Sequence, residues 1–219
     1  MTPHGRTAED SLSRNDRLGR TAMFQVRFHG RGGQGVVTAA ELLASAAFRE
    51  DRYAQAFPSF GSERMGAPVM SFCRIDGKPI RTHEPVTDPD ALLIQDPTLL
   101  HQTDLFAGLK PGGYVLLNSA RSFGELGLAD LADLAVEQDR NRFRTLSASN
   151  LAMAHLGRPL PGAPMLGGLA ALTGVVGLEA VLAAIADRFA GKVAAGNAAA
   201  ARAAFEFVAS ELARERADA

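Results

Sequence analysis

The chain has 219 residues, a formal net charge of −1 and 47% hydrophobic against 21% charged residues, which is typical of a globular protein with a sizeable core. So small a net charge gives no reason to expect binding to nucleic acid or to an anionic membrane. The single cysteine, Cys73, excludes an iron–sulfur cluster or a structural zinc site held by this chain alone, because each needs a set of about four protein ligands.

The N-terminal residues 1–22 are polar and rich in Arg, Ser, Thr and Asp. They lack the apolar core of a secretory signal, and their acidic residues are untypical of a transit peptide. We expect a disordered tail over residues 1–22, then a single domain over residues 23–215, in a cytoplasmic protein.

The first distinctive motif is Gly30-Arg31-Gly32-Gly33-Gln34-Gly35. It follows an alternating apolar run at residues 24–28 and leads into residues 36–43, whose apolar positions have helical spacing. The first, third and sixth positions are glycines, as in the turn of dinucleotide-binding proteins. Amide groups at the start of such a helix favour an anion, so the motif predicts a strand, an anion-friendly loop and a helix.

A nicotinamide site usually adds an acidic residue about twenty positions later, where it binds a ribose hydroxyl. Here residues 53–58, a predicted strand, contain no carboxylate, which argues against NAD binding. The motif alone also fits a turn that only packs a helix on a strand.

The next segments predict an exposed loop and then a hairpin. Residues 58–68 carry Glu63 and Arg64 between glycines, so they form either a solvated connection or a binding loop. The alternating run at residues 69–75 and the segment at residues 80–83 predict a hairpin, and Cys73 within it is expected to be a buried thiol.

Further strands and helices alternate along the second half. Residues 90–95 and 114–119 are apolar runs typical of strands that are covered on both faces. Asp96 is predicted to cap a helix that starts at Pro97, and this helix is expected to reach about residue 109. A short strand at residues 143–147 and helices to residue 213 complete an α/β, Rossmann-like, doubly wound and mainly parallel sheet with a hairpin and a helical C-terminal part.

The sequence shows no catalytic machinery of its own. It has no local context for a Ser-His-Asp triad, no paired histidines at metal-binding spacing and no thiamine-diphosphate motif. His29 and His83 are expected to be structural or solvated. These features predict a component of a larger assembly.

Several linked motifs together resemble the gamma subunit of the pyruvate/2-oxoacid:ferredoxin oxidoreductases. They are Arg27-Phe28-His29-Gly30-Arg31-Gly32-Gly33-Gln34-Gly35, Tyr53-Ala54-Gln55-Ala56-Phe57-Pro58, Glu63-Arg64, Gln95-Asp96-Pro97-Thr98-Leu99-Leu100 and Leu156-Gly157-Arg158-Pro159. The resemblance covers about residues 24–210. One departure is Met65, which stands where the family commonly has a second arginine after Arg64.

The resemblance implies a subunit of a complex that oxidatively decarboxylates a 2-oxoacid to an acyl-CoA and carbon dioxide. It implies alpha, beta and ferredoxin-like delta partner subunits, which hold thiamine diphosphate, Mg²⁺ and 4Fe–4S clusters, with coenzyme A as acyl acceptor. Electrons would pass to ferredoxin, or to NAD through a flavoprotein. Neither nucleic acid nor a membrane is an expected partner.

The resemblance also implies which residues contact the substrate and coenzyme A region or a partner subunit, with no catalytic residue and no metal ligand in this chain. They are Gly30, Arg31, Gly32, Gly33, Gln34, Gly35, Glu63 and Arg64. The turn does not require the long side chains of Arg31 and Gln34, so these are expected to reach such a ligand or partner. The alternative is a stand-alone dinucleotide-binding oxidoreductase or sensor that uses Gly30–Gly35.

The absence of cofactor motifs yields the first testable prediction. The chain purified alone should be colourless and inactive, with no bound thiamine diphosphate or iron–sulfur cluster. Absorption spectra and turnover assays check this, and a brown or active preparation would contradict it. Calorimetry with NAD, NADP, FAD and coenzyme A distinguishes the subunit from the stand-alone alternative. Dinucleotide binding with a micromolar Kd, a binding free energy of about 8 kcal/mol, would favour a stand-alone enzyme.

Overall fold

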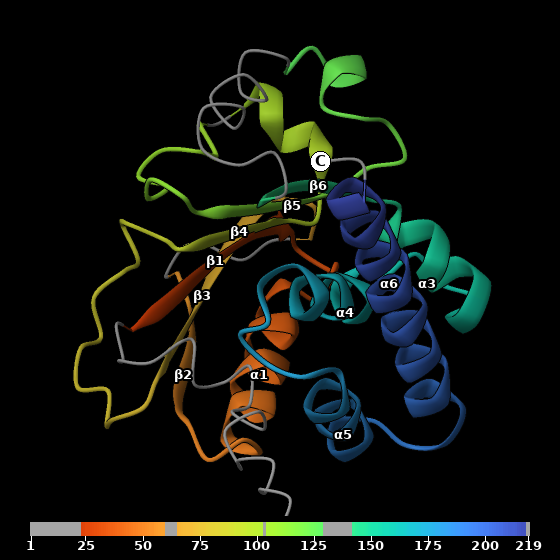
Figure 1. Ribbon diagram of the computed structural model, residues 1–219. Coiled ribbons are helices and arrows are strands. Elements are labelled where there is room, and N and C mark those ends of the chain that lie inside the picture. Colours follow the sequence, from red (N-terminus) through yellow and green to blue (C-terminus); the bar gives the residue numbers. More distant parts are fainter. Residues whose placement is uncertain (1–22, 60–64, 103, 129–141, 218–219) are drawn as a thin grey trace, which may run out of the picture.

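The computed structural model describes residues 23–59, 65–102, 104–128 and 142–217. The N-terminal tail predicted at residues 1–22 lies outside this range. The described residues fold into one six-stranded sheet and a layer of five α-helices (Figure 1), which confirms the α/β class. The strands are β1 Phe24–Arg31, β2 Tyr53–Pro58, β3 Pro68–Asp76, β4 Ala91–Ile94, β5 Tyr114–Asn118 and β6 Phe143–Leu146. The helices are α1 Val36–Phe48, α3 Ala148–Leu156, α4 Gly162–Thr173, α5 Leu178–Arg188 and α6 Gly191–Ala217.

The strand order in the sheet is β2-β3-β1-β4-β5-β6. The neighbours β1, β4, β5 and β6 are parallel, whereas β3 runs antiparallel to both β1 and β2. The mainly parallel sheet expected from the sequence is therefore confirmed. The strand predicted at residues 143–147 is also present, as β6.

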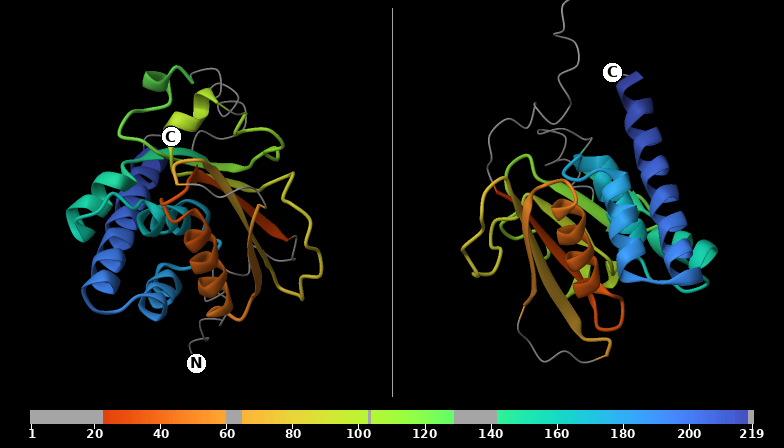
Figure 2. Two further views of the ribbon diagram at one scale, coloured as in Figure 1. Left: turned by 180° about the vertical axis from the view of Figure 1, so that it is seen from behind. Right: turned by 90° about the horizontal axis from the view of Figure 1, so that it is seen from below.

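The two faces of the sheet are covered differently. Alternate residues of β4 contribute to two hydrophobic clusters, with Leu93 on the helical side and Leu92 on the other. All five α-helices lie on one face, and α6 runs along the outside of their layer (Figure 2). Within the described ranges, the other face is covered by the short 3₁₀ helices η2 Pro97–His101 and η3 Gly124–Leu126 and by loops. The buried strands predicted from continuous apolar runs are thus confirmed.

The hairpin predicted from residues 69–75 and 80–83 is wrong in its second arm. β3 pairs with β1 on one edge and with β2 on the other, so neither edge is left for residues 80–83. Buried arginines hold the connection from β3 to β4 instead of a β-ladder: Arg74 donates to the carbonyl groups of Glu84 and Pro85, and Arg27 donates to that of Thr87 at 3.4 Å. The hairpin of the fold is β2–β3.

The helix expected to reach about residue 109 is also shorter than predicted. Asp96 caps η2 as expected and accepts from the amide of Thr98 at 2.9 Å, but this helix ends at His101. Further along, the Asp104 carboxylate accepts from the amides of Phe106 and Ala107, both at 3.1 Å. A local side-chain turn therefore replaces helical hydrogen bonds.

The remaining predictions for the core are confirmed. Cys73 is a fully buried free thiol, and desolvation raises its pKa. The apolar stripe of the helix near residue 181 packs through Val181 and Ile185, and the alanine-rich C-terminal helix is α6. None of the helices formed by the described residues is long and apolar enough to span a membrane.

Close contact between α4 and α6 depends on Gly167, which yields a stability prediction. A Cβ at Gly167 would overlap the backbone carbonyl group of Ala201 on α6. Gly167→Ala should therefore lower the free energy of unfolding by about 2 kcal/mol or more, measured by urea denaturation.

The matched control is Gly162→Ala in the same helix, where the nearest atom to an added Cβ is 3.5 Å away. This contact is ordinary, so the control should change stability by less than about 1 kcal/mol. Equal effects of the two substitutions would contradict the packing argument.

Candidate functional site

The candidate site lies where the carboxyl ends of β1 and β4 meet. These parallel strands are neighbours, but the chain leaves β1 toward α1 on the helical face and leaves β4 toward η2. Such a divergence opens a crevice at the carboxyl edge of a sheet, where α/β proteins bind ligands. The glycine motif follows β1 here, and Gln95 and Asp96 follow β4.

The glycines of the loop have distinct structural roles. A Cβ at Gly30 would lie 2.6 Å from the Val36 side chain, so this glycine permits close packing of β1 against α1. Gly33 and Gly35 have φ values of 93° and 76°, which glycine adopts without steric cost. The loop is also held from outside, since the amide of Gly32 donates to the carbonyl group of Ala67 at 2.9 Å.

The Asp96 carboxylate is the centre of a hydrogen-bonded cluster that we call the Asp96 clamp. It accepts from Gln34 Nε2 at 2.7 Å, from the hydroxyl and amide groups of Thr98 at 2.6 and 2.9 Å, and lies 3.3 Å from Arg31 Nε. Burial alone raises the pKa of Asp96, but the bonds from Thr98 and Gln34 and the charge of Arg31 together lower it below its usual value. The carboxylate is therefore ionised at neutral pH.

Gln34 joins the clamp to the glycine loop. Its amide group donates to Asp96, while its Oε1 accepts from the backbone amide of Arg31 at 2.8 Å. One side chain thus connects the start of the glycine turn to the segment that follows β4.

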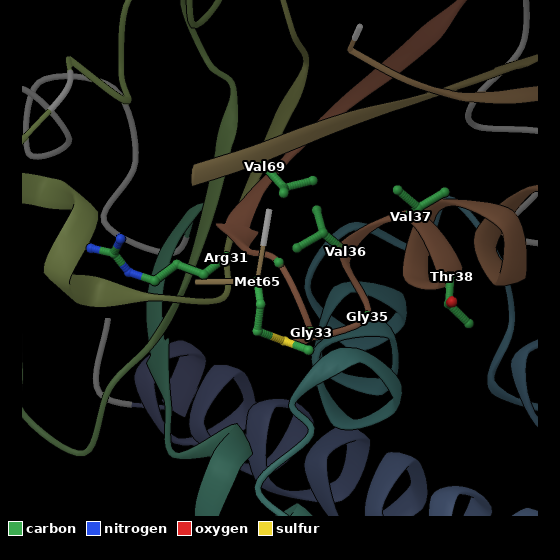
Figure 3. A pocket seen from close by; sticks show the side chains of 9 residues that line it. Arg31, Gly33, Gly35, Val36, Val37, Thr38, Met65 and Val69 are labelled. Atoms are coloured by element: carbon green, nitrogen blue, oxygen red, sulfur yellow. The ribbon is translucent and has the colours of Figure 1, made fainter. Parts of the chain in front are cut away.

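The Arg31 guanidinium completes the clamp. It donates to Thr98 Oγ1 at 2.8 Å, to the Gly66 carbonyl group at 3.1 Å and to Gln102 Oε1 at 3.3 Å. Figure 3 shows it pointing away from the glycines. The sequence did not reveal these contacts. The predicted contact of Arg31 and Gln34 with coenzyme A or a partner stays a prediction.

A cavity of about 440 Å³, the glycine-loop cavity, opens beside this motif. Met65 lies over Gly33 at its edge, where its side chain is 89% exposed (Figure 3). The cavity is lined by Arg31, Gly32, Gly33, Gly35, Val36, Val37, Thr38, Met65 and Val69. These described residues supply backbone groups, a cation, a hydroxyl and apolar surface, which suits binding rather than acid–base chemistry.

His29, just before the motif, is a structural residue of β1, as expected. It is 6% exposed, and its Nε2 accepts from Arg27 Nε at 3.0 Å. Desolvation, followed by the nearby Arg27 cation, lowers the pKa of His29 to about 4. Neutral imidazole is therefore the form present at physiological pH. His83, also expected to be structural or solvated, is exposed and forms a hydrogen bond with Gln55 at 2.7 Å.

Two of the predicted site residues, Glu63 and Arg64, lie outside the described residues. Of the six residues of the glycine motif, Arg31, Gly32, Gly33 and Gly35 line the glycine-loop cavity together with Met65, whereas Gln34 binds Asp96. Sequence reasoning identified Asp96 only as a helix cap. Its position directly after a buried strand, at the same sheet edge as the glycine motif, is the signal that could have indicated the clamp.

The structure supplies no ribose-binding carboxylate at β2. This strand lies at the edge of the sheet, and β3 separates it from β1, so it is not the neighbour of the strand that leads into the glycine motif. Among the described residues, no group of three or more His, Cys, Asp or Glu side chains is placed to hold a metal ion.

Comparison with known proteins establishes the family. The sequence model of the pyruvate ferredoxin/flavodoxin oxidoreductase family matches residues 25–207. The chain belongs to this family. It is 45% identical over 184 residues to the pyruvate synthase subunit PorC of Methanothermobacter marburgensis, covering 84% of this chain and 97% of that subunit. It is 46% identical over 184 residues to the common gamma subunit of the pyruvate/ketoisovalerate oxidoreductases of Thermococcus litoralis, covering 84% and 96%.

A solved structure of the same family has the same fold. The crystal structure of the pyruvate oxidoreductase subunit PORC of Thermotoga maritima matches with a TM-score of 0.69 and 34% identity, covering 84% of this chain and 96% of that one. The resemblance stated from the glycine motif and the segments that follow it is therefore confirmed. So is the mostly parallel α/β fold that it implied.

The clamp predicts a pH-dependent contribution of Asp96 to stability. Asp96→Asn should lower the free energy of unfolding by about 2 kcal/mol at pH 7, because it removes charge-assisted bonds. Since the folded pKa is lowered, this stability is present above the unfolded pKa of about 4 and is lost as pH falls through the folded value.

Urea unfolding at several pH values measures this difference. The control is Asp51→Asn, an exposed aspartate whose backbone has a φ of 56°, a conformation that asparagine tolerates. If the difference in free energy of unfolding between Asp96→Asn and the parent protein does not decrease as the pH is lowered, the assignment is contradicted.

Proposed function

We propose that this chain is the gamma subunit of a complex that oxidatively decarboxylates a 2-oxoacid, such as pyruvate or a branched or aryl 2-oxoacid. The acyl group passes to coenzyme A and carbon dioxide is released. Alpha and beta subunits and a ferredoxin-like delta subunit are its partners. Thiamine diphosphate, Mg²⁺ and 4Fe–4S clusters belong to those chains, and two electrons leave to ferredoxin or, through a flavoprotein, to NAD. The location is the cytoplasm.

Family membership over residues 25–207 is the observation that carries the proposal. The relatives named above are themselves subunits of pyruvate synthase or of pyruvate/ketoisovalerate oxidoreductases. The surroundings of the reactive side chains in this chain also favour a supporting, non-catalytic role. The one cysteine is buried, and the Asp96 carboxylate is fully engaged by its neighbours rather than available as a base.

The role proposed for this chain is to present a rigid surface next to the catalytic centre. The glycine motif offers backbone amides and the start of α1 at the glycine-loop cavity. Glu63 and Arg64 directly precede Met65 in the sequence, and Met65 lines this cavity. Such a surface favours an anionic group of coenzyme A or a carboxylate of a partner subunit. The clamp fixes its shape before the ligand or partner arrives, which lowers the entropic cost of binding.

Purification of the tagged full chain from its native host tests the proposal. The expected result is co-purification of further subunits, with a brown colour, bound thiamine diphosphate and coenzyme A-dependent oxidation of one member of a 2-oxoacid panel. Recovery of a monomer that binds a dinucleotide would overturn it and favour the stand-alone alternative.

Arg31 supplies a test of the contact surface. Arg31→Ala should cost about 1–2 kcal/mol of stability, because several bonds of the clamp are lost. In the assembled complex it should raise the KM for coenzyme A or weaken subunit assembly, measured by steady-state kinetics and size-exclusion chromatography.

The control for Arg31→Ala is Thr98→Val, which removes hydroxyl contacts of the same clamp and leaves the cation in place. Equal effects of the two variants on KM and assembly would show that Arg31 acts only by supporting the fold.

A further inference from the structure

A second cavity, on the other side of the glycine motif, has a different character. It measures about 280 Å³ and lies between α1, the start of α4 and α6, so we call it the helical cavity. Its lining includes the apolar side chains of Leu42, Leu156, Leu160, Phe189 and Val193. A cavity of this size and lining suits a small ligand with a hydrocarbon part.

The polar groups of the helical cavity favour a negative charge. Arg158 lines it, and its guanidinium group forms no hydrogen bond or ion pair with any described residue. None of the described lining residues is acidic. The Asp96 carboxylate, which binds Gln34 behind the lining, is neutralised by Arg31. A single cation thus faces the cavity without a counter-ion.

The amino ends of two helices also reach the helical cavity. Thr38 in the first turn of α1 and Gly162 at the first position of α4 both line it. The N-cap residues, Gly35 and Pro161, have no side chain that can accept a hydrogen bond, and the first turns contain no acidic residue. The amide groups of these turns therefore remain suited to an external acceptor.

A buried amide next to this cavity lacks a partner. Gln95 is 1% exposed, and within the part of the chain that the structure describes neither its Nε2 nor its Oε1 has a hydrogen-bond partner. A Cβ built on Gly162 would lie 3.9 Å from Gln95 Nε2 and 3.8 Å from the Gly35 carbonyl oxygen. The Gln95 amide nitrogen therefore lies next to Gly162, one of the residues that line the helical cavity. An unpaired buried amide is costly, which points to a missing ligand group.

We propose that the helical cavity binds a small organic monocarboxylate with a hydrocarbon tail. The carboxylate lies between Arg158 and the amino end of α4, within reach of the Gln95 amide. The tail lies among the apolar side chains of α1 and α6. One unpaired cation matches one negative charge, and a hydrocarbon tail matches the remaining walls. This inference does not depend on the proposed function, because it rests only on residues of this chain.

Calorimetry on the full chain tests the inference with 4-methylpentanoate as the probe. Its neutral isostere 4-methylpentanamide and the tail-less acetate are the comparison ligands. We expect saturable binding of 4-methylpentanoate and at least about tenfold weaker binding of the other two, because each lacks one of the two recognised parts. Binding of the amide as tightly as the acid, or no saturable binding of the acid at millimolar concentration, would overturn the proposal.

Variants locate the binding site. Arg158→Gln should weaken 4-methylpentanoate binding about tenfold, and Val193→Trp, at a position 47% exposed, should block the cavity without disturbing the core. The control is Arg81→Gln, an exposed arginine on the connection between β3 and β4. Circular dichroism verifies that each variant is folded. Equal affinities of the Arg158 and Arg81 variants would refute the assignment.

Methyl NMR gives a readout that does not require a variant. Added 4-methylpentanoate should shift the methyl signals of Leu42, Leu160 and Val193. Shifts confined to Val37 and Val69 would place the ligand in the glycine-loop cavity and overturn the proposal. Because both measurements use the chain without partners, their outcome is distinguishable from failure to form an oxidoreductase complex.

Discussion

The ionised carboxylate of Asp96 ties together the segments that leave β1 and β4. Gln34 comes from the glycine motif, Arg31 from the end of β1 and Thr98 from the start of η2, and all three bind this one group. The Asp96 side chain is only 11% exposed, so its charge is compensated by protein rather than by water. Among the described contacts, the bond to Asp96 is the only hydrogen bond that joins the Gln34 side chain to the segment after β4.

The glycine motif lies between two cavities that differ in exposure. Gly33 and Gly35 line both the glycine-loop cavity and the helical cavity. One side presents an open surface edged by the exposed Met65, whereas the other is enclosed by helices and mostly apolar. A change in the loop would alter both spaces together, because the same backbone forms a wall of each.

The sequence predicted the elements with strong local signals and missed those that depend on distant partners. Hydrophobic periodicity and glycine spacing correctly located the buried strands, the glycine turn after β1 and the helices of the C-terminal part. The second arm of the hairpin failed because Pro79 and its neighbours alternate like a strand, yet β1 and β2 already occupy both edges of β3. The clamp was missed because Arg31 and Asp96 are 65 positions apart, and no spacing rule joins them.

The connection between β3 and β4 illustrates how buried cations can order a segment that has no regular structure. Its carbonyl groups are bound by Arg74 of β3 and Arg27 of β1, which also binds the carbonyl groups of Leu105 and Ala107. These guanidinium groups are in position only after the two strands have paired. The order of this connection therefore depends on the pairing of β1 with β3, so a change that separates these two strands would also release the connection.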